Sequence, residues 1–264
     1  MDSLPDVDLV SQADAPTAIC IDDVESDSEG FASDDLVELF SVPRVASFVR
    51  AMGGQSDTSL DLASPGAQCR DFLDATDQAF GLQTIYRVRP KMLSLTPPCT
   101  MFSQLTQRWN LKLLTEYEQR VKLDEAETLF DYAIQSARTQ HARGGYFFLE
   151  QPSGASSWKR LQRNLAATPM PKARGHPERT TSFVIFDQCR YGLVSPRGAP
   201  MKKSTKFWTN SPKIIAEFNH KTCKCTTRHQ RIEGKQNGHQ LSQWAQKFPP
   251  QMCAAIAKCI MDES

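Results

Sequence analysis

Basic side chains are missing from the first part of this sequence. No Lys or Arg precedes Arg44, although Asp and Glu recur there, and residues 1–33 show no hydrophobic periodicity. A segment of this composition cannot bury enough apolar surface to fold, so we predict a disordered acidic tail over residues 1–33. The acidic opening also lacks the basic and apolar leader of a secretory signal.

Long apolar runs are absent too. No stretch approaches the ~20 apolar residues that a membrane-spanning helix needs, so we expect no membrane partner. The eight cysteines are spread over 264 residues, unlike the dense disulfide framework of a small secreted domain. We therefore expect an intracellular, reducing location, which would be nuclear in a eukaryote.

Acidic residues are scarce in a later part of the chain. Between Trp158 and Lys235 many Lys and Arg residues stand against only four acids, although the net charge of the whole chain is +1. A basic surface favours a phosphate-rich partner, and an ordinary solvated surface is the alternative interpretation.

Strand and helix patterns alternate through the rest of the sequence. This alternation predicts an α/β fold with a mostly parallel, doubly wound sheet, in which ligands bind at the carboxyl ends of the strands. We assign residues 34–264 to one domain, with residues 196–245 as a small basic recognition insert, irregular and polar. Strands are expected at 36–40, 58–62, 91–95, 146–149, 182–186 and 206–209, and helices at 44–52, 71–79, 111–143, 157–165 and 251–261.

Cys99 follows one of these strands in the turn Thr96-Pro97-Pro98-Cys99. The two prolines stiffen the turn, so the cysteine points in a fixed direction at low entropic cost. A cysteine in such a turn can act as a nucleophile where its thiolate is favoured. The alternative is a buried structural cysteine.

Several motifs occur in the order found in C5-cytosine-specific DNA methyltransferases. Residues 97–103 resemble the family's Pro-Cys-Gln-x-Phe-Ser loop, and residues 147–152 resemble the strand that ends in Glu-Asn-Val or Glu-Asn-Pro. Residues 187–192 resemble the Gln-x-Arg motif, and residues 248–256 the last motif, where a Pro-Pro pair starts the closing helix. Residues 37–41 are similar to the cofactor strand Asp-Leu-Phe-x-Gly, and Asp61 falls where a ribose-binding acid is expected.

The resemblance implies a Rossmann-like, S-adenosylmethionine-dependent methyltransferase that acts on C5 of cytosine, in DNA rather than RNA. It also implies a small divergent member, of the kind carried by phages or mobile elements. Its catalytic residues would be Cys99, Glu150 and Arg190. Cofactor-binding residues would be Phe40, Ser41, Asp61, Asp71 and Pro97, and substrate-binding residues would be Pro98, Ser103 and Gln188.

The sequence departs from the family at several places. The last motif has Lys247-Phe248 instead of its usual Gly-Asn, and the target-recognition region is very short. The loop at residues 40–44 has no glycine, Gln151 replaces an asparagine, and Gly192 stands where a second arginine is usual. Val and Pro cannot take the positive φ that such a glycine loop often uses. A non-catalytic nucleic-acid-binding module with the same fold is therefore the alternative. A cysteine hydrolase is a third interpretation, which requires a histidine beside Cys99.

A polar part of the predicted insert contains residues of the types that bind zinc. Cys223, Cys225, His229 and His239 are candidates, with Cys-x-Cys spacing. This spacing is tighter than the Cys-x2-Cys of standard zinc fingers, so the sequence favours a polar loop without metal over a zinc site.

Overall fold

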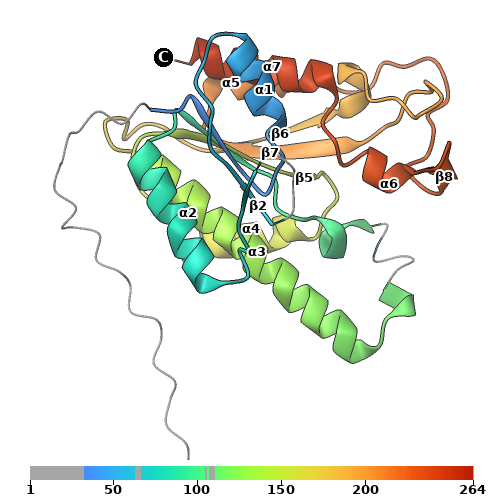
Figure 1. Ribbon diagram of the computed structural model, residues 1–264, viewed down its shortest axis with the longest axis horizontal. Helices are drawn as coiled ribbons and strands as arrows, with labels where there is room; N and C mark the ends of the chain where they lie inside the picture. The colour runs from blue at the N-terminus through green and yellow to red at the C-terminus, as the bar shows by residue number, and fades with distance from the viewer. Residues whose placement is uncertain (1–32, 63–66, 105, 107–110, 264) are drawn as a thin grey trace, which may run out of the picture. The chain divides into compact units, whose positions relative to one another are not determined.

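The computed structural model describes residues 33–62, 67–104, 106 and 111–263 (Figure 1). The chain divides into two units, Met1–Phe31 and Ala32–Ser264. The predicted acidic tail lies outside the described residues. Among the described helices, none is long and apolar enough to cross a membrane.

A seven-stranded sheet forms the centre of the second unit, in the order β3-β2-β1-β4-β5-β7-β6. All neighbouring strands are parallel except β7, which runs antiparallel to both β5 and β6. The α/β fold class with a mostly parallel, doubly wound sheet that the sequence predicts is confirmed. The strands are β1 Leu36–Leu39, β2 Ser59–Asp61, β3 Gln68–Cys69, β4 Met92–Leu95, β5 Tyr146–Pro152, β6 Ser182–Asp187 and β7 Ser204–Thr209.

Helices cover both faces of this sheet, as Figure 1 shows. On one face Val37, Leu93 and Phe147 pack with side chains of α2 Ala75–Val88, α3 Glu116–Ala142 and α4 Ser157–Ala167. On the other face their neighbours Leu36, Met92 and Phe148 pack with α1 Arg44–Ala51, α5 Pro212–Phe218 and α7 Pro250–Asp262. Adjacent strand residues point to opposite faces, so strands buried on both sides are apolar throughout.

Capping residues correct two of the expected helices. The helix expected at 71–79 begins only at Ala75, because the Asp74 carboxylate accepts hydrogen bonds from the amides of Thr76 and Asp77, and it continues to Val88. The helix expected at 111–143 begins at Glu116, where Thr115 and Glu118 form a capping box. A short 3-10 turn, η3 (Leu111–Leu113), precedes it.

The expected insert at residues 196–245 is wrong in its bounds. It contains β7, which lies between two strands of the main sheet, and α5, which packs on that sheet. Residues 196–203 and 219–245 remain outside the sheet, and residues 219–245 are hereafter called the insert. It includes β8 Lys235–Gln236, β9 His239–Gln240 and α6 Leu241–Trp244, and a small separate cluster of Leu193, Met201, Leu241 and Ala245 packs at its end.

Candidate active site

The order of the strands changes direction between β1 and β4, and the loops after these two strands meet at that point. The hydroxyl of Thr96, just after β4, lies 3.1 Å from the carbonyl oxygen of Phe40, just after β1, and donates a hydrogen bond to it. The amide of Thr96 donates to the Leu39 carbonyl at 3.3 Å. In open α/β sheets this switch point is where ligands bind. The loops that follow β1 and β4 are therefore joined at the position where a ligand is expected.

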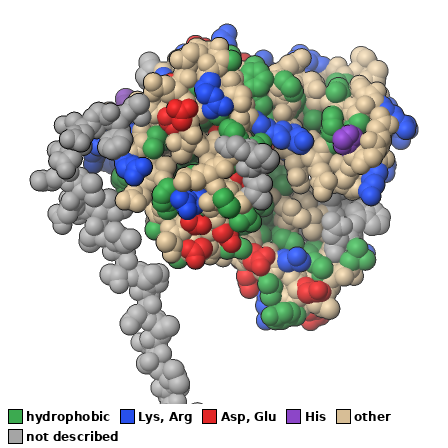
Figure 2. All heavy atoms as spheres, in the orientation of Figure 1, with side chains coloured by type: hydrophobic (Ala, Val, Ile, Leu, Met, Phe, Trp, Pro, Cys, Tyr) green, Lys and Arg blue, Asp and Glu red, His purple; other side chains and the backbone are tan. Residues whose placement is uncertain are grey.

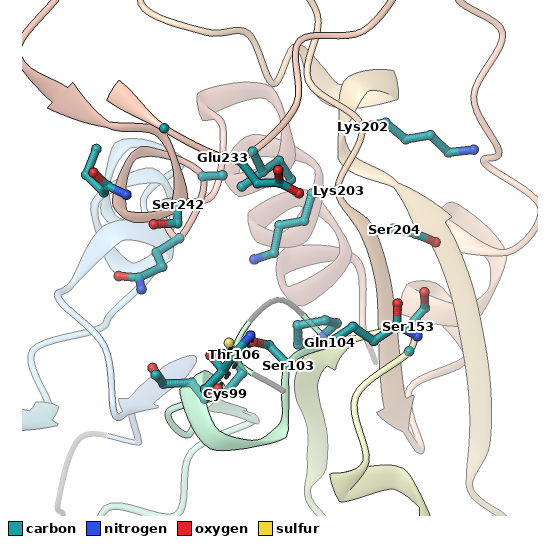
Figure 3. Close-up of a pocket in the computed structure, with 18 residues that line it drawn as sticks. Cys99, Ser103, Gln104, Thr106, Ser153, Lys202, Lys203, Ser204, Glu233 and Ser242 are labelled. Atoms are coloured by element: carbon teal, nitrogen blue, oxygen red, sulfur yellow. Dashed lines mark hydrogen bonds between the residues drawn. The ribbon is translucent and has the colours of Figure 1, made fainter. Parts of the chain in front are cut away.

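Cys99 lies at the wall of a pocket of about 640 Å³. Its side chain is partly exposed, and the short 3-10 helix η1 (Thr100–Phe102) follows it. Figure 3 shows Cys99 and Ser103 on one side of the pocket and Glu233 of the insert on the other. A volume of this order is typical of small-molecule sites.

Gln151 fixes the loop that carries Cys99. The fully buried Gln151 amide donates to the Pro97 carbonyl oxygen at 2.6 Å and accepts from the Ser157 hydroxyl at 3.3 Å. The sequence departs from the family here, because Gln151 stands for an asparagine. The longer side chain still reaches the Pro-Pro turn, so the end of β5 and the loop after β4 are held together.

Glu150 is paired with a lysine that the sequence did not single out. The Lys203 ammonium lies 3.3 Å from Glu150 Oε1, and both side chains are largely buried. Glu150 Oε1 has no hydrogen-bond partner among the described residues, so this oxygen is left with the ion pair alone. Figure 3 shows Lys203 pointing into the pocket above Cys99, while Lys202 points away.

The direction of β7 explains how Lys203 reaches this position. Because β7 is antiparallel to β5, its first residues lie beside the last residues of β5, with Thr205 opposite Pro152. Lys203 immediately precedes β7 and therefore lies near Glu150. No sequence signal for this contact exists within either strand, because it depends on strand order.

The charges around Cys99 set the protonation of its thiol. Burial raises the pKa of Cys99 above its ordinary value, and the negative charge of Glu150 raises this pKa further. The Lys203 ammonium acts in the opposite direction and lowers it. The free protein therefore holds Cys99 as a thiol at neutral pH, and formation of the thiolate depends on how the charges of Glu150 and Lys203 change when a ligand binds.

The residues expected to bind the base are only partly brought together. Ser103 lines the pocket, whereas Pro98 is exposed outside its lining. Gln188 is fully buried. Its side-chain amide donates to the Thr205 hydroxyl at 3.0 Å, and its backbone N–H donates to the Lys203 carbonyl at 3.0 Å. It thus supports Lys203 instead of facing the pocket.

Arg190 lies on the 3-10 helix η4 (Gln188–Tyr191), exposed and outside the described lining of the pocket. The cation beside Glu150 is Lys203, not Arg190. A contact of Arg190 with a substrate stays a prediction.

A positive φ angle occurs in the loop after β1 although this loop has no glycine. Phe40 has φ of 63°, a left-handed conformation that is strained for a bulky residue. Its ring packs edge-on against Phe72, with centroids 4.9 Å apart. Phe40 is therefore the left-handed residue of this glycine-free loop, and the Ser41 hydroxyl donates to the Val42 carbonyl at 2.8 Å.

The other expected cofactor residues lie at or near strand ends. Asp61 is the last residue of β2, at the same edge of the sheet as Phe40. The Asp71 carboxylate accepts from the Leu73 amide at 3.0 Å and so serves a turn before α2. Pro97 is buried and contributes its carbonyl oxygen to Gln151.

Glu38 of β1 is a further buried acid that the sequence did not single out. Its carboxylate accepts hydrogen bonds from the amides of Val45 and Ala46, at 3.4 and 3.1 Å, in the first turn of α1. Since Pro43 provides no side-chain cap, Glu38 caps this helix from the sheet. Burial raises the pKa of Glu38 from 4.5 to about 7, although these hydrogen bonds and Arg44 lower it.

Three of the four candidate metal ligands come together in the structure. Cys223, Cys225 and His229 form a cluster with Cys189, and their ligand atoms all lie within 4.8 Å of one another. His239 instead packs its ring beside that of Trp244, with centroids 5.0 Å apart. His239 is therefore wrong as a candidate ligand, and Cys189 of η4 is the fourth residue of the cluster instead.

Some basic residues of the later part of the chain are used inside the structure. Arg160 pairs with Glu127 and Asp131 on α3, at 2.6 and 2.5 Å. Arg179 stacks on the Tyr146 ring at 4.0 Å. Lys202 remains exposed, and Figure 2 shows further Lys and Arg side chains along the side of the view where the insert lies in Figure 1. Lys and Arg side chains are thus exposed on the side of the insert, and Figure 2 shows others scattered over the rest of this face.

Comparison with known proteins adds one distant structure. No family model matches the chain, and no curated protein matches it. The solved structure of a methyltransferase from Entamoeba histolytica is similar to it, with 10% identity and a TM-score of 0.35, over 67% of this chain and 52% of that chain. The chain thus spans about half the length of that methyltransferase. Function is therefore inferred from the residues of the site.

Proposed function

We propose that this protein transfers a methyl group from S-adenosylmethionine to C5 of cytosine in DNA, through a covalent bond between Cys99 and C6 of the base. One observation carries the proposal. Cys99 and Glu150 come from the carboxyl ends of the adjacent parallel strands β4 and β5, Lys203 before β7 pairs with Glu150, and Cys99 and Lys203 line one pocket.

The first step would use Cys99 and Glu150 together. The Cys99 sulfur adds to C6, the C5–C6 π electrons move to form a C4–C5 double bond, and the C4–N3 π electrons move to N3, which takes a proton. The Glu150 carboxylate would hydrogen-bond the exocyclic amine, take the proton of the Cys99 thiol and pass it to N3. Glu150 thus ends the step as the carboxylate it was at the start, and the adduct carries no net charge.

The second step forms the product and restores the cysteine. C5, now an enamine carbon, would take the methyl group that the bound cofactor supplies, the N3 lone pair would restore the C4–N3 double bond, and the donor sulfur would keep the electrons of the broken S–CH₃ bond. Loss of the C5 proton to solvent would return an electron pair to the C5–C6 bond and expel Cys99 as thiolate. Glu150 would carry the N3 proton back to this thiolate, so the base ends neutral and the cysteine ends as a thiol. Lys203 would hold the carboxylate of Glu150 in place and stabilise the departing thiolate by its positive charge.

The chain's residues fit a nucleoside cofactor at the ends of β1 and β2. When bound, the cofactor supplies an activated methyl group on a sulfonium sulfur. The left-handed Phe40 allows the tight turn after β1 that such a site requires, and Asp61 at the end of β2 would accept hydrogen bonds from ribose hydroxyls.

The alternative cysteine chemistry lacks its partner group. A cysteine hydrolase needs a histidine within hydrogen-bond reach of the nucleophile. Among the described residues that line the pocket with Cys99 there is no histidine. His141 is buried and bonded to Asn210 instead, at 2.9 Å. The site is therefore better suited to addition to a base than to acyl transfer.

Methyl transfer tests the proposal directly. Purified full-length protein is incubated with cytosine-containing DNA and labelled S-adenosylmethionine, and the methyl group is located by nucleoside analysis. We expect label at C5 with wild type and none with Cys99→Ala. Cys259→Ala is a matched control, because Cys259 is buried on α7, in the layer on the other face of the sheet, and we expect it to retain activity. Equal activity of Cys99→Ala and wild type would overturn the assignment of Cys99.

Cofactor binding separates this function from a non-catalytic module. Titration with S-adenosylhomocysteine by calorimetry should show binding, and Asp61→Ala should weaken it by about tenfold or more, the value of a lost charge-assisted hydrogen bond. Retention of DNA without any binding of S-adenosylhomocysteine would favour the nucleic-acid-binding module instead.

A further inference from the structure

We propose that Cys189, Cys223, Cys225 and His229 bind one structural zinc ion, which joins the insert to the loop after β6. The four residues come from two segments, η4 and residues 223–229, and their ligand atoms lie within 4.8 Å of one another. This inference does not depend on the proposed methyl transfer.

The distances suit a tetrahedral ion. With Zn–S bonds of about 2.3 Å and Zn–N bonds of about 2.0 Å, neighbouring ligand atoms of a tetrahedral site lie about 3.5–3.8 Å apart. The sulfur of Cys223 and Nε2 of His229 are 3.3 Å apart, a few tenths of an ångström from this spacing. All four ligand atoms lie within 4.8 Å of one another, so the longest separations close by about 1 Å when the ion binds. Three thiolates and an imidazole, with all four ligands from protein, are the composition of a closed structural zinc site.

Backbone groups already support the ligands. The amide of Cys225 donates to the sulfur of Cys223 at 3.4 Å, and the amide of Cys223 donates to Asp187 Oδ2 at 2.8 Å. Asp187 is the last residue of β6, two positions before Cys189. β6 therefore positions both segments of the cluster. Cys189 follows this strand in the chain, and Cys223 is held by its hydrogen bond to the Asp187 carboxylate.

The insert needs a source of stability other than a hydrophobic core. From Asn219 to Gln240 no side chain is buried, and all of these residues are described. The small cluster around Leu241 and Met201 lies only at its far end. A polar segment of this length cannot offset its conformational entropy by burial, whereas binding a metal ion supplies folding free energy directly.

A disulfide would fit the same residues less well. The three cysteines are free thiols in the structure, and a bond between two of them would leave the third sulfur and His229 without a role. A zinc ion uses all four groups. Zinc also explains why one histidine nitrogen lies within the sulfur cluster, since imidazole and thiolate are both favoured zinc ligands.

The proposed ion would also stabilise one wall of the pocket. The backbone N–H of Gln188, the residue before Cys189, donates to the Lys203 carbonyl, and Lys203 pairs with Glu150. On the other side of the cluster, Glu233 follows His229 by four residues and lines the pocket. The site thus holds two segments that face the substrate, and the ion itself stays away from the chemistry.

Metal analysis of the full-length protein, purified with a reductant and without chelators, tests the inference. We expect one zinc per chain by mass spectrometry of the metals. Cys189→Ser and Cys223→Ser should lower zinc affinity by about tenfold or more. The matched controls are Cys69→Ser, an exposed cysteine outside the cluster, and His239→Gln, which removes the histidine that sequence spacing favoured. Both should retain zinc.

A rescue variant keeps the test valid where a ligand variant does not fold. His229→Cys should retain zinc in a four-cysteine site, while His229→Ala should lose it; a merely structural histidine would not show this contrast. Cobalt substitution should give the absorption of a tetrahedral thiolate site, weakened by Cys189→Ser. Zinc far below one per chain, equal zinc loss in His239→Gln and Cys189→Ser, or a disulfide among the three cysteines would each overturn the inference.

Discussion

The Gln151 side chain donates to the Pro97 carbonyl at 2.6 Å, across 54 positions of sequence. This hydrogen bond joins the end of the strand that carries Glu150 to the turn that carries Cys99. It therefore fixes two groups of the proposed reaction relative to each other without touching the substrate.

Replacing Gln151 tests this positioning role. Gln151→Leu leaves the buried Pro97 carbonyl without its donor, which should cost about 1–3 kcal/mol of unfolding free energy. The displaced Cys99 turn should lower kcat by about 10²-fold, with the Kd for DNA nearly unchanged. Ser157→Ala, which removes only the second partner of Gln151, should have a smaller effect on both. A fall in DNA affinity with unchanged kcat would contradict the positioning role.

The reactivity of Cys99 should respond in opposite directions to its two charged neighbours. Because Glu150 raises the pKa of Cys99 and Lys203 lowers it, Glu150→Gln should shift the pH profile of Cys99 alkylation to lower pH, and Lys203→Met should shift it to higher pH. Peptide mass spectrometry separates Cys99 from the other cysteines. Glu233→Gln removes a different carboxylate of the pocket and serves as the control.

Loss of Lys203 also leaves the Glu150 charge buried without its partner, which destabilises proteins by about 3–5 kcal/mol. The double variant Lys203→Met/Glu150→Gln should recover part of this loss and keeps the measurement interpretable if the single variant unfolds. Shifts of the same sign for Glu150→Gln and Lys203→Met would show that the pair does not control Cys99.

Stability should fall with rising pH because of Glu38. Its pKa is about 7 in the folded protein against 4.5 ordinarily, so between these values the native state keeps a proton that the unfolded state releases. Raising the pH from 4.5 to 7 therefore lowers the unfolding free energy, by on the order of 3 kcal/mol. Glu38→Gln should remove this part of the pH dependence in urea unfolding measured at pH 5 and pH 8. An unchanged difference between the two pH values would contradict it.

DNA binding should depend on exposed cations and not on those already paired. Lys202 is largely exposed, with a single carboxylate partner at 3.8 Å, so Lys202→Gln should weaken DNA binding and reduce the slope of log K against log salt by about 1. Arg160→Gln is the matched control. Since Arg160 pairs with Glu127 and Asp131, its loss should lower stability by about 1 kcal/mol and leave the salt dependence unchanged. Equal slopes for both variants would argue against a DNA contact at Lys202.

Local sequence patterns predicted most of the sheet and its covering helices. The runs around Leu36, Leu93 and Phe148 form strands where expected, because buried parallel strands are largely apolar along their length. Short elements were missed: β3 has two residues and α5 seven, too few for a clear period. The insert was placed too broadly because the strand expected at 206–209 was assigned to it, whereas this strand lies between β5 and β6 in the main sheet.

The sequence by itself determined that Cys99 follows one buried strand and that Glu150 lies near the end of another, because strand periodicity and the Pro-Pro turn belong to short segments of chain. Only the tertiary structure brought Lys203 to Glu150, Gln151 to Pro97 and Cys189 to the zinc-ligand cluster. Each of these contacts joins segments far apart in sequence, and each depends on the order and direction of β4, β5, β6 and β7. Strand order and direction arise from the packing of the whole domain, so no local pattern could specify these partners.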